Sequence, residues 1–290
     1  TTTYSSLPTN WHVASNIGNT GAATFNFGQD DTFGGVVTAE GNADGNGKGV
    51  FKYAPPTGFL ALCSANLSVS DDIDPAGDDG ETENPTKQFN TILYTGTGSS
   101  NAISGLGFQP DLVWLKQRGS SGSNMLLDTN RGTNSRLSSN NTNDEKTASS
   151  YFTSFDSDGF TVTGNDSISN VSSGTFVGWC WKSAGGTTST NNEGNHTCTL
   201  QANAKAGFSI MTLANYTSAS GVTIGHGLGK APSMYIHKSR ASSGNWHVYH
   251  SGRGATKALL LNNTNAEATA IGYWANTEPT ADVLSLGNTF

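Results

Sequence analysis

The sequence predicts an all-β chain built from tandem β-sandwich modules, and three observations carry that prediction. Only 13% of the 290 residues are charged, about half of the ~25% that is usual for globular domains. Turn signals recur every ~8–12 residues between short apolar segments, as in sandwiches and barrels, and no stretch has a helical period. The third observation is an internal duplication. The loops are rich in Gly, Asn, Ser and Thr, and Gly alone accounts for 36 residues.

The duplication holds one register over about forty residues. Residues 105–145 recur without a gap at 227–267, at a constant offset of 122 (227 − 105). Duplicated units keep their framework and diverge in specific contacts, so recurring charged residues favour structural hydrogen bonds and ion pairs over ligand binding. Four charged pairs recur: Lys116/Lys238, Arg118/Arg240, Arg131/Arg253 and Glu145/Glu267.

Short runs rich in β-branched and aromatic residues predict the strands. In the first unit these are 89–95, 111–116, 124–128 and 175–181, with a hairpin over 151–163 that turns at Asp158-Gly159. In the second unit they are 208–213, 233–238, 246–249 and 283–286. The second unit has no counterpart of 175–181. A sandwich without that buried strand exposes a sheet edge, so we expect a longer parent chain or a neighbouring chain to supply it.

Composition divides the chain into five parts: an N-terminal β segment at 1–68, an acidic linker at 69–87, a first sandwich repeat at 88–184, a Gly/Thr/Asn-rich linker and lead-in at 185–206, and a second repeat at 207–290. Within the first part, 24–29, 49–53 and 58–62 are expected to form short strands. The acidic run 71–83 could hold calcium. Its spacing is unlike that of an EF-hand, which favours a solvated linker.

Two groups of motifs carry a resemblance. FNFGQ at 25–29, followed by GVFKYAPPTGFLALCSANL at 49–67, resembles the closing part of SPRY-like, concanavalin-type sandwiches in tailed-phage virion proteins. ISGLGFQPDLVWLKQR at 103–118, with SFDSDGFTV at 154–162, resembles a repeat of large structural proteins of marine tailed bacteriophages. The resemblance implies jelly-roll or concanavalin-like sandwiches in a tail fibre or surface appendage, on the extracellular face of the virion. It also implies a homo-oligomer, with a trimer as the typical copy number, and contacts with other virion proteins.

The charge and the motifs exclude several other classes of function. A net charge of −7 argues against nucleic acid as a partner, because phosphate binding needs clustered Lys and Arg. The sequence contains no run of ~18–20 apolar residues, so it predicts no segment that inserts into a membrane. Gly105-Leu106-Gly107 lacks the later glycine and helix of a nucleotide loop, and no serine lies in a G-x-S-x-G elbow. Histidines are dispersed and no CxxC pair occurs. We therefore predict no cofactor, metal site or catalytic residue, and Cys180 as a small buried apolar residue.

Trp246, His247 and Tyr249 are the candidate binding residues, because the first unit has only Asn124, Met125 and Leu127 at these positions. These side chains could stack on a sugar, pack on a partner or replace core residues. Other tryptophans, Trp114, Trp179 and Trp181, are predicted in the core.

The leading hypothesis is a non-enzymatic virion structural protein that contacts host-surface glycans through its loops. A cellular lectin-like adhesin on the same sandwich is the alternative. A glycan-degrading enzyme is a third hypothesis, since paired carboxylates can be distant in sequence.

Overall fold

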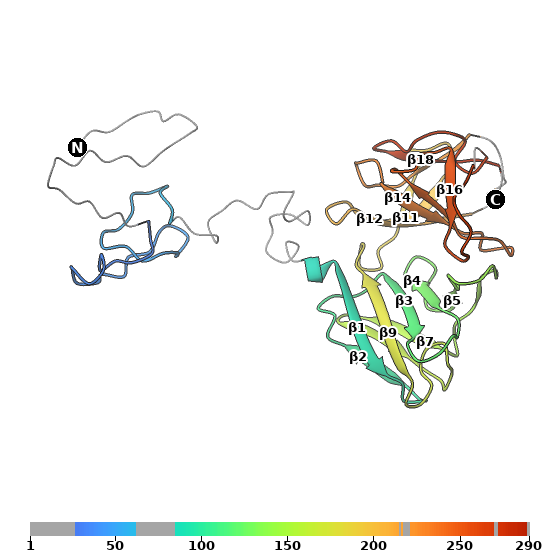
Figure 1. The fold of residues 1–290 in the computed structure, drawn as a ribbon, viewed down its shortest axis with the longest axis horizontal. Coiled ribbons are helices and arrows are strands. Elements are labelled where there is room, and N and C mark those ends of the chain that lie inside the picture. The colour runs from blue at the N-terminus through green and yellow to red at the C-terminus, as the bar shows by residue number, and fades with distance from the viewer. Residues whose placement is uncertain (1–26, 62–84, 215, 217–220, 270–271, 289–290) are drawn as a thin grey trace. The chain divides into compact units, whose positions relative to one another are not determined.

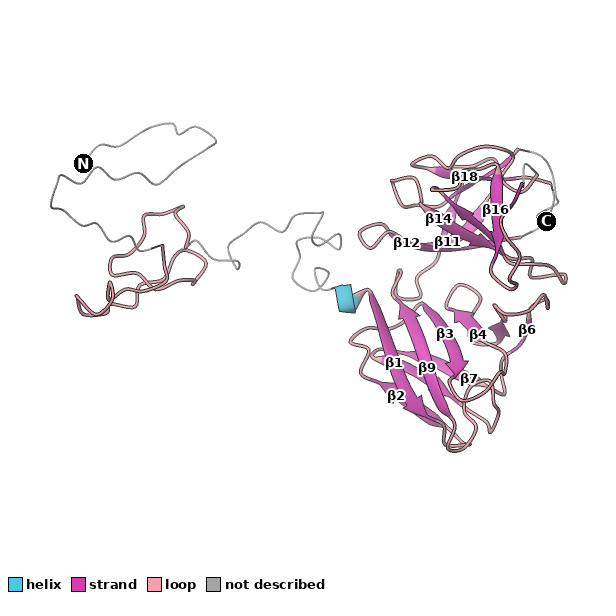
Figure 2. Cartoon of the chain, viewed as in Figure 1, coloured by secondary structure: helices cyan, strands magenta, loops and turns pink. Residues whose placement is uncertain are grey.

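The computed structural model describes residues 27–61, 85–214, 216, 221–269 and 272–288 (Figure 1). The chain forms two compact units, Thr1–Val69 and Ser70–Phe290. Apart from the three-residue 3-10 turn η2, Pro85–Lys87, every regular element among the described residues is a β-strand (Figure 2). The all-β prediction is therefore confirmed.

In the N-terminal unit, residues 27–61 form turns joined by an isolated antiparallel bridge between Asn42 and Phe51. Side chains hold these turns in place. The Asp44 carboxylate accepts hydrogen bonds from the backbone N–H groups of Lys48 at 2.8 Å and Ala61 at 2.7 Å. The strands predicted at 49–53 and at the described part of 58–62 are wrong. Val50 and Phe51 donate their N–H groups to the Gly28 and Asn42 carbonyls without building a ladder, and Ala61 donates to the Asp44 carboxylate. The run 71–83 and the strand predicted at 24–29, except for residues 27–29, lie outside the described residues.

Repeat 1 (residues 88–184) contains a four-stranded antiparallel sheet and a three-stranded one. The first has the order β1 (Phe89–Thr95), β9 (Thr175–Trp181), β3 (Leu112–Gln117), β4 (Met125–Asp128). The second has the order β2 (Asn101–Ser104), β8 (Gly159–Val162), β7 (Phe152–Asp156). A short pair, β5 (Ser135–Arg136) and β6 (Lys146–Thr147), lies beside them. The predicted strands of this repeat agree with β1, β3, β4, β7, β8 and β9 to within one or two residues.

Strand β9 is the centre of the first sheet. It pairs antiparallel with β1 on one side and β3 on the other (Figure 1). Its buried residues are Phe176, Gly178 and Cys180, at alternate positions, as one face of a strand requires. Neighbouring side chains leave little room for a larger residue at Gly178. A Cβ there would lie 3.1 Å from the Leu115 side chain and 3.4 Å from that of Ile92.

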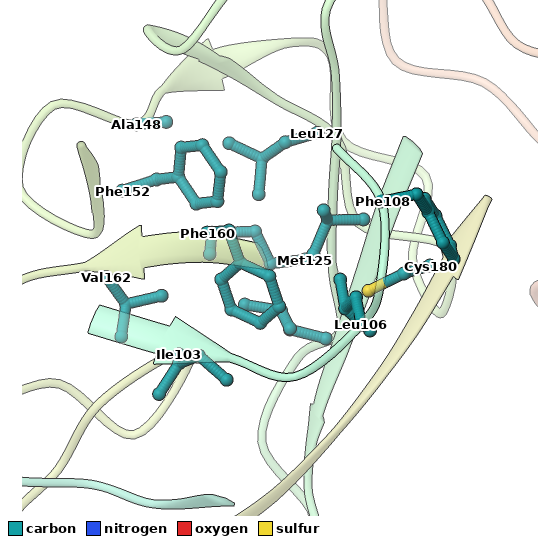
Figure 3. Close-up of a cluster of buried hydrophobic side chains, with 12 residues drawn as sticks. Ile103, Leu106, Phe108, Met125, Leu127, Ala148, Phe152, Phe160, Val162 and Cys180 are labelled. Carbon is teal, nitrogen blue, oxygen red and sulfur yellow. The ribbon is translucent and has the colours of Figure 1, made fainter. Parts of the chain in front are cut away.

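The core of repeat 1 fills the space between its two sheets. Side chains from both sheets and the connecting loops converge there, and Phe160 and Leu127 are completely buried (Figure 3). The Asp158-Gly159 turn joins β7 to β8, as predicted. Its Asp158 carboxylate accepts the N–H groups of Gly105 at 2.9 Å and Gly107 at 2.5 Å, and both glycines have positive φ.

Trp114 and Trp179 do not lie in this core, contrary to the prediction. Val113 and Leu115 face the core with no exposed surface, so the alternation of β3 directs Trp114 to the opposite face. There its ring meets Trp179 edge-on, with centroids 6.0 Å apart. Trp181, also half-buried, packs against Phe89 and Phe208. Alternation was visible in the sequence, but which face is covered depends on the second sheet.

Repeat 2 (residues 207–288) follows the same plan. Its strands are β12 (Phe208–Leu213), β13 (Val222–Gly225), β14 (Met234–His237), β15 (His247–His250), β16 (Lys257–Leu260), β17 (Ala268–Thr269) and β18 (Val283–Leu286). Strands β4 and β15, like β6 and β17, are separated by the 122-residue offset of the sequence repeat. Tyr273 and Trp274, at the 122-residue offset from Tyr151 and Phe152, lie in a turn, whereas Phe152 begins β7.

The segment 185–206, predicted as a linker and lead-in, contains two strands. Strand β10 (Ser189–Asn191) pairs with β11 (Cys198–Asn203), and β11 pairs with β12, which makes a separate three-stranded sheet. Cys198 and Leu200 are buried in the core of repeat 2, and this burial explains why a Gly/Thr/Asn-rich segment becomes ordered.

Candidate functional site

A groove of about 650 Å³ opens in repeat 2 between β12 and β14. Its apolar lining comes from four strands. The residues are Met211, Leu213, Ile224, Tyr235, Leu284 and Leu286. All of them belong to the core of repeat 2 or pack against it. The groove therefore reaches the side of the core itself.

Both walls of the groove are sheet edges. Strand β14 ends the order β14-β15-β16-β17, and β12 ends the order β10-β11-β12. In repeat 1 the corresponding strands, β3 and β1, both pair with β9. The groove thus occupies the position that β9 fills in repeat 1.

One end of the groove is polar and charged. The Lys238 ammonium donates to the backbone carbonyls of Ser239 at 2.6 Å and Ser242 at 3.3 Å. Burial lowers the pKa of Lys238 below its usual value, against the opposing effect of Asp144. Lys116 makes the same kind of contact in repeat 1, to the carbonyls of Ser120 and Gly122. This lysine closes a turn in each repeat.

Glu145 joins the two repeats at this end. Its carboxylate accepts two hydrogen bonds from Arg240, both 2.8 Å long, and one from Arg131 at 3.2 Å. Burial by itself raises the pKa of Glu145, but the bonds from the two arginines outweigh it, so the net pKa is lowered. Arg131 also bonds Asp128 at 2.6 Å, and Arg253 pairs with Glu267. The prediction that these recurring charges are structural is confirmed for Lys116/Lys238, Arg131/Arg253 and Glu145/Glu267.

Half-buried His237 on β14 lines the groove and pairs with buried His247 on β15. Burial lowers the pKa of each to about 4, with Lys238 contributing to both. Both imidazoles are therefore neutral at pH 7. Neutral rings of this kind belong to the packing of the repeat and supply no positive charge for a ligand.

The three candidate binding residues are all in the interior. The exposed fractions are 6% for Trp246, 7% for His247 and 1% for Tyr249. The Trp246 indole donates from Nε1 to the Ser138 carbonyl of repeat 1 at 2.9 Å. Tyr249 stacks on Tyr235 with centroids 4.6 Å apart, and His247 lies 4.2 Å from the Tyr273 ring. Of the three roles the sequence left open, these contacts match core replacement, not an exposed stacking platform.

Potential metal ligands in the described ranges are dispersed. No group of three or more His, Cys, Asp or Glu side chains is placed there to hold a metal ion. Burial raises the pKa of the thiols of Cys180 to about 12 and of Cys198 to about 11, so both stay protonated. Cys180 is the buried apolar residue that the sequence predicted. The same ranges contain no helix long and apolar enough to cross a membrane.

The fold defines a tandem-repeat, all-β protein whose second repeat carries a groove between two sheet edges. Residues 84–290, more than half of the chain, match the family described as domain of unknown function DUF7483, and the chain belongs to that family. Neither a curated protein nor a solved structure matches the chain.

Sequence reasoning named none of the groove residues as a site. Met211, Tyr235 and Ile236 look like ordinary strand residues in the sequence, and only the structure shows that they border the groove.

Proposed function

We propose that this chain is a non-enzymatic structural protein of a bacteriophage virion, part of a tail fibre or surface appendage, that assembles into a β-rich oligomer. The observation that carries the proposal is the use of the charged residues. In a chain with so few of them, Arg240 of repeat 2 binds Glu145 of repeat 1, and Arg131 of repeat 1 holds the same carboxylate in place. Residues committed in this way serve rigidity and not the recognition of a substrate.

The contact between the repeats supports the same role. Trp246 packs with Leu126, Leu137 and Trp114 of repeat 1. Backbone bonds accompany it, from Gly244 N–H to the Thr142 carbonyl at 2.8 Å and from Glu145 N–H to the Arg240 carbonyl at 2.9 Å. Repeats joined through an apolar contact and backbone bonds form a stiff rod segment, which is what a fibre or appendage requires.

The test is to locate the chain on the particle. Antibodies against residues 85–290 should label purified virions at a tail fibre or appendage in electron micrographs, at sites repeated by the symmetry of that part. Labelling only of host cells, with virions bare, would replace this proposal with the cellular lectin-like adhesin.

The proposal assigns glycan contact to the exposed turns, because Trp246, His247 and Tyr249 are buried. A glycan array with the assembled protein tests it, and binding to no glycan would leave a purely architectural role. Incubation with host capsule polysaccharide should leave its viscosity unchanged. A fall in viscosity would favour the glycan-degrading enzyme.

A further inference from the structure

We propose that Thr129 and Gln201 form an intramolecular ester, a covalent crosslink between repeat 1 and the sheet of β10, β11 and β12. Thr129 directly follows β4, and Gln201 lies in β11. The two residues are 72 positions apart in the chain, yet their side chains are in contact. The crosslink does not depend on the virion role proposed above, because it follows from the local geometry of these side chains.

Strand alternation directs Gln201 toward repeat 1. Its neighbour in β11, Leu200, is buried in the core of repeat 2, so Gln201 points to the opposite face of the sheet. Gln201 is nevertheless only 1% exposed. Asn130 of repeat 1 fixes the contact, since its side-chain amide donates to the Thr199 carbonyl of β11 at 3.0 Å. The Gln201 carboxamide is thus enclosed between two parts of the chain, where little water reaches it.

The Thr129 hydroxyl lies against the carboxamide of Gln201. Its oxygen, Oγ1, is 2.8 Å from one terminal atom of the amide and 3.1 Å from the other. Because both atoms are bonded to Cδ, these distances place Cδ within the ~3–3.5 Å that a near-attack arrangement requires. A backbone bond from the Thr129 N–H to the Asp111 carbonyl at 2.9 Å fixes the main chain that carries this hydroxyl.

The neighbours of the Gln201 amide determine its orientation. With the amide nitrogen 3.1 Å from Oγ1, Nε2 donates to Asp111 Oδ1 at 3.1 Å, and Oε1 accepts the backbone N–H of Asn130 at 3.2 Å. The reverse orientation would turn Oε1 toward the Asp111 carboxylate, an acceptor facing an acceptor. The amide oxygen therefore lies beside a backbone donor that stabilises the negative charge developing on it during attack.

Asp111 has the position of a general base. Its Oδ1 accepts the Thr129 hydroxyl at 2.8 Å and lies 3.1 Å from Nε2 of Gln201. The carboxylate is completely buried, and it is held in place by the backbone N–H groups of Ser183, Gly185 and Gly186. One oxygen can therefore take the proton from the hydroxyl and deliver it to the departing nitrogen.

The reaction balances without an oxidant or a cofactor. Oγ1 of Thr129 attacks Cδ of Gln201 while the hydroxyl proton passes to Asp111. The bond between Cδ and Nε2 then breaks, the proton moves from Asp111 to Nε2, and the nitrogen leaves as ammonia. The products are one ester bond and the original Asp111 carboxylate. Because the site is buried, water has little access to hydrolyse the ester.

Repeat 2 has no such arrangement at the equivalent position. Ser251 and Ser233 stand at the 122-residue offset from Thr129 and Asp111. They keep the backbone bond, from the Ser251 N–H to the Ser233 carbonyl at 2.8 Å, but a hydroxyl replaces the carboxylate. The shared backbone bond therefore belongs to the framework of both repeats, whereas the contact of carboxylate, hydroxyl and carboxamide is specific to repeat 1.

Mass spectrometry of the full chain, purified after folding and then unfolded and reduced, tests the crosslink. We expect an intact mass lower than that of the sequence by one ammonia. Trypsin should release residues 119–131 and 183–205 as a single branched peptide, which hydroxylamine should separate because it cleaves esters. An intact mass equal to that of the sequence, or two separate tryptic peptides, would overturn the proposal.

Substitutions at the three reacting groups sharpen the result. Thr129→Val removes the hydroxyl while keeping the shape, and Gln201→Glu removes the leaving nitrogen, so each variant should keep its full calculated mass. Thr129→Ser keeps a hydroxyl and should still lose ammonia. Asp111→Asn should slow the loss of ammonia by ~10²-fold or more, as expected for removal of a general base. Loss of ammonia from Thr129→Val at the wild-type rate would contradict the assigned nucleophile.

The matched control is Ser251→Ala, which removes the hydroxyl at the equivalent position of repeat 2. This variant should lose ammonia as the wild type does. Retention of its full mass would mean that any change at such a turn prevents the reaction, and would contradict the assignment to Thr129. Circular dichroism establishes that each variant is folded, and the wild-type peptide map decides the proposal even where a variant is not.

Discussion

Repeats 1 and 2 share a framework and differ in how each is completed. Both keep the turn-closing lysine and an arginine–glutamate pair, but the side chain of Arg131 is 4% exposed and that of Arg253 is 54% exposed. Repeat 1 is filled by β9, whereas the same position in repeat 2 is a groove. The comparison teaches that the duplicated charges preserve turns, while the environment of each copy decides how strongly they are held.

The two copies also differ in the side chains that fill equivalent places. Repeat 1 has Leu115 and Met125 where repeat 2 has His237 and His247, and Asn124 where repeat 2 has Trp246. Exchanging residues between the copies therefore supplies internal controls for the first three of the predictions below, which are given in order of expected effect.

Exchanging Trp246 for its repeat 1 counterpart should have the largest effect. Trp246→Asn empties the apolar contact between the repeats and removes the bond to Ser138. A large-to-small change of this kind costs about 3–5 kcal/mol. Denaturant unfolding followed by circular dichroism should show this loss and a second transition as the repeats separate. The control, Asn124→Ala, should cost about 1 kcal/mol. Equal losses in the two variants would contradict the assigned role of Trp246.

The next exchange is Asp111→Ser, which installs the repeat 2 residue in repeat 1. The buried Asp111 carboxylate accepts backbone N–H groups of Ser183 at 2.6 Å, Gly185 at 2.9 Å and Gly186 at 2.6 Å, directly after β9. Leaving these donors without a charged acceptor should cost about 3 kcal/mol. The control, Asp144→Asn at an exposed carboxylate, should leave the midpoint of unfolding unchanged. A matching shift in the control would mean that total charge, not this site, is being measured.

The histidine pair predicts a pH dependence that belongs to repeat 2. The folded pKa values are about 4 and the unfolded value is about 6.5, so the unfolded chain takes up protons first as the pH falls. The free energy of unfolding should therefore fall between pH 6.5 and pH 4, by on the order of a few kcal/mol, and level off below pH 4. Denaturation curves at a series of pH values measure it.

The control for this prediction is the double exchange His237→Leu and His247→Met, which copies repeat 1. It should flatten the curve above pH 4.5, leaving the carboxylates to act at lower pH. If the slope survives the exchange, the histidines are not its cause.

Arg240→Ala should have the smallest effect. The side chain of Arg240 is 40% exposed in its pair with Glu145, so screening by solvent limits the loss to about 0.2–1 kcal/mol. Arg131 keeps Glu145 partly neutralised. The loss should shrink further in 1 M salt, as measured by thermal unfolding at two ionic strengths. A salt-independent loss would indicate lost packing and not lost charge.

Much of the strand pattern could be predicted because it is local. The extents of β1, β9, β12 and β18 follow from runs of β-branched and aromatic residues bounded by turns. In the N-terminal segment the same pattern predicted strands that do not form, so a local pattern by itself does not determine a strand. A run such as 49–53 becomes a strand only if another strand pairs with it, and among the described residues its pairing is limited to the single bridge between Phe51 and Asn42.

The candidate site was harder to predict, because the identity of an aromatic residue does not show whether its side chain is buried or exposed. The sequence left sugar stacking, partner packing and core replacement open for Trp246 and Tyr249; the structure covers Trp246 with repeat 1 and Tyr249 with Trp274 and Tyr235. A single sequence cannot tell which side of a two-faced strand is buried.

Read without coordinates, the chain already reveals its class, its duplication and the structural use of its recurring charges, since all three are written in composition, spacing and period-two alternation. Burial of Trp246 between the repeats, the neutral histidine pair and the open groove beside β14 depend on contacts between residues far apart in the chain. Such contacts arise from packing, which excludes water from one face and leaves another exposed, and no local pattern encodes that choice.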